Sequence, residues 1–151
     1  MLAAPPVWPE QAWRTAQPSC GRKLKIIVLA TSPLIAFVAT ASPERARRFY
    51  AEVLGLTLRS EDDFALVFDG NGIMLRVVRV AEVAPVERTV LGWQVADIQA
   101  TVRELADRGV RFERYSFTTQ DDAGIWTTPD GSRVAWFKDP DGNLLSLTQL
   151  A

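Results

Sequence analysis

The chain has 151 residues, of which 48% are hydrophobic, and its formal net charge is −1 with acidic and basic residues interspersed. This length fits a single domain with a substantial hydrophobic core. The balanced charge gives no basic face of the kind that DNA, RNA or an anionic membrane requires, so the sequence predicts neither a nucleic-acid partner nor a membrane partner.

Histidine is absent from the sequence, and Cys20 is its single cysteine. Without histidine there is no serine-histidine-aspartate triad, no cysteine-histidine pair and no imidazole metal ligand. Any metal site would have to use carboxylates, and any proton transfer would use Asp, Glu, Lys, Tyr or water. A lone cysteine cannot form an intrachain disulfide, which is typical of a reducing compartment, and we expect a cytoplasmic protein.

Residues 1–32 differ from the rest of the chain, with scattered prolines, two tryptophans and no sustained periodicity. We predict an irregular N-terminal extension over this range and a domain over residues 33–151. Residues 22–42 imitate a secretory signal, with a basic start, an apolar run and an Ala-x-Ala-like end, but Pro33 interrupts the run. We therefore interpret LIAFVAT, residues 34–40, as a buried strand.

A helix is predicted to begin at Ser42 as the N-cap, with Pro43 at the first helical position and Glu44 in the first turn. It is expected to end at Gly55, which favours the backbone conformation of a helix C-terminus. One stripe of apolar residues at helical spacing predicts a helix that covers a sheet. The stripe consists of Ala46, Phe49, Tyr50, Val53 and Leu54.

Three short runs rich in β-branched and aromatic residues follow this helix, and the whole pattern then repeats after a linker around residues 81–88. In the second copy, Asp97 is the predicted helix N-cap and Gly109 the predicted stop. The predicted strands of the first copy are at residues 56–60, 64–68 and 73–80, and those of the second are at 89–95, 110–115, 124–128, 133–138 and 144–150.

This repetition predicts an α+β fold of two βαβββ modules, at about residues 33–80 and 88–150, each a curved mixed sheet with a helix on its outer face. Three segments together resemble the vicinal oxygen chelate superfamily, which includes glyoxalase I, bleomycin resistance proteins and extradiol dioxygenases. They are PERARRFYAEVLGL (43–56), DIQATVRELADRGVRF (97–112) and KDPDGNLLSLTQ (138–149). The resemblance covers about residues 34–149 and implies sheets curved around a cavity, often in a homodimer with exchanged modules.

In metal-dependent members of that superfamily, a divalent ion in the cavity is held by His or Gln and Glu side chains from the first and last strand of each module. The resemblance places these positions at Ile35, Val90 and Ser146, with the fourth in the segment 74–77. None of these residues offers a carboxylate or an imidazole, which divalent ions prefer as ligands. The sequence therefore predicts no metal and no other cofactor.

Strand alternation extends the expected cavity lining, because residues two apart share a face of a sheet. If Ile35, Val90 and Ser146 point inward, the lining is an apolar chamber with a few polar points, as is typical of small-molecule sites. The same alternation places Trp93 in the core against the helix. The further lining residues would be Phe37, Ala39, Gly92, Gln94, Leu144 and Thr148.

Three larger side chains have two interpretations each. Trp126 and Trp136 fit either the core or a stacking surface for a flat ligand. Arg76 fits either a cavity, where it would bind a carboxylate or phosphate, or an edge, where its stem would cover apolar surface. No catalytic residue is predicted. The candidate ligand-binding residues are Ile35, Phe37, Arg76, Val90, Gln94, Trp126, Trp136, Ser146 and Thr148.

The favoured functional hypothesis is a metal-independent small-molecule-binding protein of the glyoxalase/bleomycin resistance type, which sequesters an apolar or aromatic ligand in the module cavity. The alternative is a lyase, isomerase or dioxygenase of the same superfamily with an unrecognised site, which would need an acidic cluster from Glu61, Glu113 or Asp121. A third hypothesis is a solidly packed module that acts only through a partner. Stoichiometric binding without product separates the first hypothesis from the second.

Overall fold

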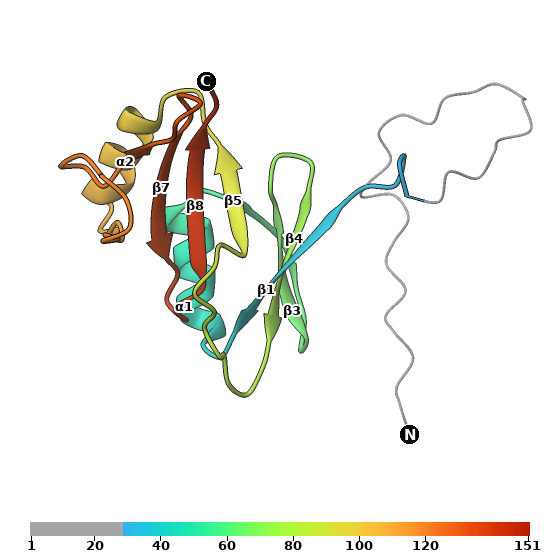
Figure 1. Ribbon diagram of the computed structural model, residues 1–151. Helices are drawn as coiled ribbons and strands as arrows, with labels where there is room; N and C mark the ends of the chain where they lie inside the picture. The colour runs from blue at the N-terminus through green and yellow to red at the C-terminus, as the bar shows by residue number, and fades with distance from the viewer. Residues whose placement is uncertain (1–28) are drawn as a thin grey trace, which may run out of the picture. The chain divides into compact units, whose positions relative to one another are not determined.

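The computed structural model describes residues 29–151, so nearly all of the predicted extension at residues 1–32 lies outside the described residues. The described chain forms two modules with the same order of elements, a strand, a helix and three strands, as the repeat predicted (Figure 1). No helix within residues 29–151 is both long enough and apolar enough to cross a membrane.

The first module contains one four-stranded mixed sheet in the order β1-β4-β3-β2. Strand β1 is parallel to β4, and the other neighbours are antiparallel. Helix α1 continues directly into a π-helical turn, η1, and the chain then turns at Gly55 with a positive φ of 74°. The elements are β1 (Ile35–Thr40), α1 (Pro43–Arg48), η1 (Phe49–Val53), β2 (Thr57–Glu61), β3 (Ala65–Asp69) and β4 (Met74–Arg79).

The second module repeats this topology in a sheet of order β5-β8-β7-β6, with β5 parallel to β8. Figure 1 shows β5, β8 and β7 side by side, with α2 packed beside them. The Asp97 carboxylate accepts a hydrogen bond from the Ala100 N–H at 3.0 Å, which confirms the predicted N-cap of α2. The elements are β5 (Leu91–Gln94), α2 (Ile98–Asp107), β6 (Trp126–Thr127), β7 (Arg133–Lys138) and β8 (Leu144–Gln149).

The predicted strand at residues 110–115 is wrong, because this segment makes only an isolated bridge between Phe112 and Phe137. The side chain of Gln120 occupies the backbone groups that a neighbouring strand would have paired. Its Oε1 accepts from the Tyr115 N–H at 2.7 Å, and its Nε2 donates to the carbonyls of Glu113 and Gly124. The Gln120 side chain and the Arg114 guanidinium, which donates to the carbonyls of Asp121 and Asp122, therefore hold this stretch as a loop.

Ser42 is also not a side-chain cap for α1, contrary to the sequence prediction. The backbone at the start of this helix is held from elsewhere. The Ala41 N–H donates to the Asp141 carboxylate at 2.9 Å, and the Ser42 N–H donates to Thr40 Oγ1 at 3.0 Å. A carboxylate from the second module thus holds the backbone just before the helix, and not the first-turn N–H groups that a side-chain cap would bond.

Each module has its own hydrophobic core between helix and sheet, and the two cores share contacts. Tyr50, Phe68 and Val77 are fully buried in the first core, and Phe137 and Leu145 in the second. Leu91 and Trp93 of β5 pack against both cores, so Trp93 faces the core side of its sheet as the alternation predicted. The two modules are therefore joined by continuous apolar packing.

The turn Asp139–Asn143 between β7 and β8 fastens the second module to the first. The Tyr50 hydroxyl donates to Asp139 Oδ2 at 2.8 Å, Thr40 Oγ1 donates to Asp141 Oδ2 at 2.6 Å, and Asn143 Nδ2 donates to the Ala39 carbonyl at 2.8 Å. Burial, and then the charge of Asp139, raise the pKa of the Tyr50 phenol far above its usual range. Tyr50 therefore remains a neutral hydrogen-bond donor across the physiological pH range.

Candidate functional site

Each sheet has a helix-covered face and an opposite face, which we call the open face. In the first module, Val38 and Val77 belong to the core, so their strand neighbours Phe37 and Arg76 lie on the open face. Ile35 lies two residues before Phe37 and shares this face. Ile35 is 48% exposed and Phe37 is 59% exposed, although both belong to a regular strand. The β1 part of this open face is therefore apolar and exposed, whereas Ala65 and Val67 of β3 on the same face are buried.

The open face of the second module is centred on Ser146. Leu145 and Leu147 belong to the core, so Ser146 points to the opposite side of β8. Its register neighbours on that face are Gly92 on β5 and Trp136 on β7. A methyl group at Gly92 would lie 2.5 Å from Ser146 Oγ, so the glycine provides the space that the hydroxyl occupies. Ser146 thus lies between the backbone of Gly92 on one side and the indole ring of Trp136 on the other.

Four aromatic side chains, Tyr115, Phe117, Trp126 and Trp136, form a connected group that we call the aromatic group. The two tryptophan rings are stacked, with centroids 6.0 Å apart and planes 22° apart. Tyr115 meets Trp136 edge-on at 5.5 Å, and Phe117 lies 5.0 Å from Tyr115. The strand register places Trp136 in the Ser146 row and Trp126 in the Thr148 row, so both indoles project from the open face.

The sequence left open whether the two tryptophans belong to the core or to a stacking surface, and their register places them on the open face. Tyr115 and Phe117 were not predicted as site residues. Phe117 is 74% exposed at the start of a loop, and an exposed aromatic residue next to two stacked indoles gives a flat ligand a further apolar contact. The signal in the sequence that could have identified them is their spacing, since Tyr115 and Phe117 are aromatic residues two positions apart. The wrong prediction of a strand that ended at Tyr115 separated the two residues.

Three polar side chains lie on the same open face as the aromatic group. Gln94 pairs with Thr148 across β5 and β8, and Ser146 lies in the adjacent row. Within residues 29–151, the side chains of these three residues make no hydrogen bond with the protein. Gln94 is exposed and Thr148 is partly exposed, so these two are available as donors and acceptors for the polar edge of a bound molecule, whereas Ser146 is only 7% exposed.

The edge of this face carries one ion pair, between Lys138 Nζ and a Glu113 carboxylate oxygen at 3.3 Å. Lys138 pairs with Leu144 in the register and so belongs to the open face. Partial burial, followed by the charge of Glu113, raises the pKa of Tyr115. The second module therefore presents a mainly neutral face to a ligand, with its cation already balanced.

The acidic residues considered for an enzyme site are not brought together. Glu61 pairs with Arg79 and Arg47, and Glu113 pairs with Lys138. Asp121 accepts hydrogen bonds from two backbone N–H groups of its own loop. Among residues 29–151 there is no group of three or more His, Cys, Asp or Glu side chains able to hold a metal ion.

In metal-dependent relatives four positions hold metal ligands, and the sequence placed the fourth only within residues 74–77. The parallel strand pairs identify which residue it is. In the second module Ser146 pairs with Gly92, and Val90 lies two residues before Gly92. In the first module Arg76 pairs with Phe37, and Ile35 lies two residues before Phe37. The two modules have the same topology, so Arg76 is the counterpart of Ser146.

The four positions do not fit a divalent ion. Ile35 and Val90 have no donor atom, and Ser146 offers a neutral hydroxyl. Arg76 carries a permanent positive charge that repels a cation. Sites for divalent ions need several carboxylate, imidazole or thiolate ligands, and this set provides none.

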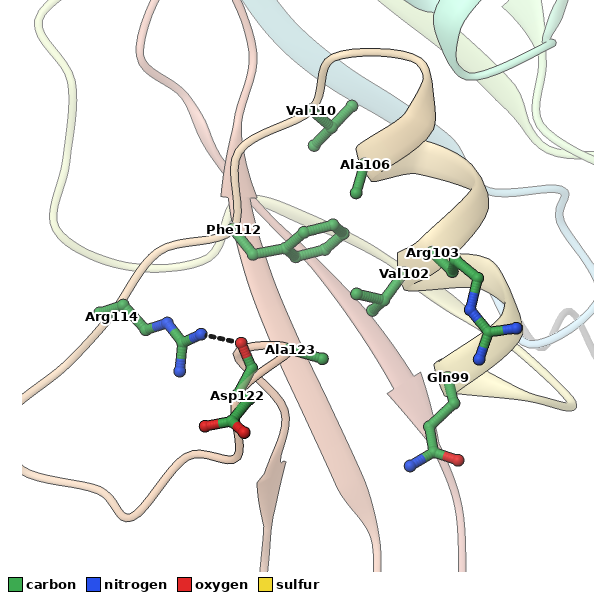
Figure 2. Close-up of a pocket in the computed structure, with 9 residues that line it drawn as sticks. All are labelled: Gln99, Val102, Arg103, Ala106, Val110, Phe112, Arg114, Asp122 and Ala123. Atoms are coloured by element: carbon green, nitrogen blue, oxygen red, sulfur yellow. Dashed lines mark hydrogen bonds between the residues drawn. The ribbon is translucent and has the colours of Figure 1, made fainter.

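A separate pocket of about 460 Å³ lies between α2 and the segment 110–123 (Figure 2). The Phe112 ring points toward α2, and an Arg114 N–H donates to the Asp122 carbonyl across the loop. None of the predicted site residues lines this pocket. It is on the helix side of the second module and is therefore distinct from the open face.

The fold and the site together define a two-module βαβββ protein whose candidate binding surface is the open face of its sheets. The chain belongs to the Glyoxalase/Bleomycin resistance protein/Dioxygenase superfamily, whose family model matches residues 32–147. This confirms the resemblance that the sequence motifs indicated. No curated protein is significantly similar to the chain in sequence.

Solved structures share the fold at low sequence identity. A glyoxalase family protein from Bacillus anthracis is 20% identical, with a TM-score of 0.62 over 79% of this chain and 94% of that one. TnmS3, an antibiotic binding protein from Streptomyces sp. CB03234, is 23% identical, with a TM-score of 0.59 over 82% and 98%. Lactoylglutathione lyase from Agrobacterium tumefaciens is 13% identical, with a TM-score of 0.61 over 79% and 93%. At these identities the likeness concerns the fold alone.

Proposed function

We propose that this protein binds and sequesters an apolar or aromatic small molecule on the open faces of its sheets, without a metal ion. The observation that carries the proposal is the stacked Trp126–Trp136 pair beside Ser146. Ser146 is the residue at a position where metal-dependent relatives have a metal ligand. Stacked indoles offer a large, flat, apolar surface to a planar molecule. The unbonded side chains of Gln94 and Thr148 would orient its polar edge.

The nature of the site favours binding over catalysis. Acid-base chemistry needs a positioned group with a suitable pKa, and the acidic residues near the open faces are held in separate ion pairs and turns. Of the structures with a similar fold, TnmS3 is named as an antibiotic binding protein and the Agrobacterium tumefaciens protein is named as an enzyme, a lactoylglutathione lyase. The four metal positions of this chain lack the donors that the metal-dependent reaction would require.

The proposal includes a homodimer in the cytoplasm. Phe37 and Ile35 leave an apolar sheet face uncovered in one chain, and contiguous exposed apolar surface of this kind marks an interaction or ligand site. A second copy would enclose the open faces and complete a cavity, as in other members of the superfamily. Light scattering of the purified protein measures the mass directly.

Substitution of either indole is expected to weaken binding of a planar probe by about tenfold or more, since loss of a buried aromatic anchor costs at least about 1.4 kcal/mol. The probe is anthracene-2-carboxamide, followed by its fluorescence in titrations of wild type, Trp126→Leu and Trp136→Leu. Phe64→Leu is the matched control, because Phe64 is 61% exposed but lies outside the aromatic group. Its affinity for the probe should equal that of wild type.

Mass spectrometry of the probe after incubation separates binding from turnover. The proposal predicts one probe per site, recovered unchanged. Equal affinity in wild type and both tryptophan variants would show that the aromatic group does not bind the probe. Conversion of the probe to a product would favour the enzyme hypothesis.

A further inference from the structure

The pocket between α2 and the segment 110–123, which we call the helix-side pocket, has an apolar floor. Val102 and Val110 are nearly fully buried there, and an edge-on contact with Phe137 of the core, 5.6 Å between centroids, anchors the Phe112 ring. The volume of about 460 Å³ lies within the range of about 300–1,000 Å³ that small-molecule sites have. The floor can therefore take up the apolar body of a small molecule.

Helix α2 supplies one wall of the helix-side pocket. Val102 and Leu105 belong to the stripe of this helix that faces the core. Gln99, Arg103 and Ala106 follow one another at spacings of four and three residues, so they form the neighbouring stripe on the helix surface. These three residues are exposed, and Arg103 forms no hydrogen bond or ion pair with any residue that the structure describes. Its guanidinium is therefore available to a ligand at the rim of the pocket.

The opposite wall is a loop that its own hydrogen bonds hold in place. The Arg114 guanidinium donates to the carbonyls of Asp121 and Asp122, and the Asp121 carboxylate accepts from two backbone N–H groups of the same loop. Gly124, at a positive φ of 88°, brings this loop close to the floor, since an added Cβ would lie 3.2 Å from Phe112 Cβ. The pocket is therefore preformed, which lowers the entropic cost of binding.

The charges around the helix-side pocket are predominantly positive. Arg103 and Arg114 place one guanidinium on each wall. The hydrogen bonds of Arg114 end on neutral carbonyls, which leave its charge uncompensated. Figure 2 shows the Asp122 carboxylate turned away from α2, and Glu104, next to Arg103 in the sequence, pairs with Arg108. The rim of the pocket therefore favours an anionic group over a cationic one.

We propose that the helix-side pocket is a second binding site of this protein and that its ligand is an aliphatic carboxylate. The apolar chain lies on the floor, where four of the five apolar lining residues are aliphatic, and the carboxylate binds Arg103. The pocket is on the helix side of the second module and the tryptophan pair is on the open face. The inference therefore goes beyond the proposed function and is independent of it.

Two probes with the same chain length, octanoate and 1-octanol, test this proposal when each is titrated into isotope-labelled protein and followed by NMR. Wild type is expected to bind octanoate about fivefold more tightly than 1-octanol, the upper end for an ion pair near the surface. The amide signals that shift should include those of Val102, Phe112 and Ala123. The signals of Ser146 and Trp136 on the open face should not move.

Two variants, each with a matched control, assign the contacts. Arg103→Gln should remove the preference for octanoate, whereas Arg111→Gln should keep it, because Arg111 is an exposed arginine that does not line the pocket. Ala106→Glu places a negative charge at the pocket and should weaken octanoate binding about tenfold or more. Ala100→Glu puts the same charge on α2 outside the pocket and should bind octanoate like wild type.

An unchanged preference in Arg103→Gln, or shifts confined to the open face, would overturn the proposed site. Absence of octanoate binding by wild type would overturn it as well. In each of these cases, binding of anthracene-2-carboxamide that is lost in Trp136→Leu would leave the proposed function intact.

Discussion

Replacement of Asp139 by alanine is expected to lower the free energy of unfolding by about 3 kcal/mol or more. Asp139 is only 5% exposed, and its carboxylate accepts hydrogen bonds from the Tyr50 hydroxyl and from the Asn143 side chain and backbone. Truncation leaves these buried donors without their acceptor, at about 1–3 kcal/mol for each unsatisfied group. The loss also loosens the turn that joins the two modules.

Urea denaturation followed by circular dichroism measures this effect. Tyr50→Phe removes one of the hydrogen bonds and should cost about 1 kcal/mol. Asp122→Ala is the control, because Asp122 is an exposed loop aspartate whose carboxylate is not part of the turn. If Asp139→Ala and Asp122→Ala unfold at the same urea concentration, the Asp139–Asn143 turn does not stabilise the contact between modules.

Introduction of metal-binding side chains at the four positions that correspond to the metal ligands of metal-dependent relatives is expected to create a metal site. The superfamily resemblance implies that these positions converge in the assembled cavity, and two imidazoles with two carboxylates form a ligand set that zinc and nickel accept. The variant should bind Zn²⁺ with a dissociation constant of about 1 μM or lower, whereas wild type should show no binding. It carries the substitutions Ile35→His, Arg76→Glu, Val90→His and Ser146→Glu.

A triple variant that keeps Arg76 is the matched control for this experiment. It has three new donors but also a permanent cation at the fourth position, so its affinity for Zn²⁺ should be lower by orders of magnitude. Isothermal titration calorimetry measures both affinities, and circular dichroism checks that both variants fold. A folded quadruple variant with no affinity for Zn²⁺ would mean that the four positions do not converge.

The order of elements was predictable because the punctuation of the sequence is clear. Pro43 after Ser42, Gly55 and Gly109 mark helix ends, and the repeat of the pattern fixes the two-module design. The failures have local causes. Gln120 bonds the backbone of Tyr115 and Gly124 through its side chain, and Asp141 bonds the backbone just before α1 from a hundred residues away. Neither contact is visible in periodicity.

The candidate site was predictable only in part. Alternation along single strands correctly assigned Trp93 to the core side. The faces of Trp126 and Arg76 depend on register between strands, which one sequence does not determine. The buried hydrogen bond between Tyr50 and Asp139 joins residues 89 positions apart. The sequence therefore predicted the turn but not its contact with the first module.

The metal content of the wild-type protein is the measurement that decides whether its ligand site works without a metal ion. Tag-free protein is soaked separately in iron, manganese, nickel, zinc and magnesium, desalted, and analysed by plasma mass spectrometry. Because the four positions that correspond to metal ligands supply two aliphatic side chains, a hydroxyl and a guanidinium, we expect no ion above background. Retention of about one ion per chain would contradict it and would show that other residues form a metal site.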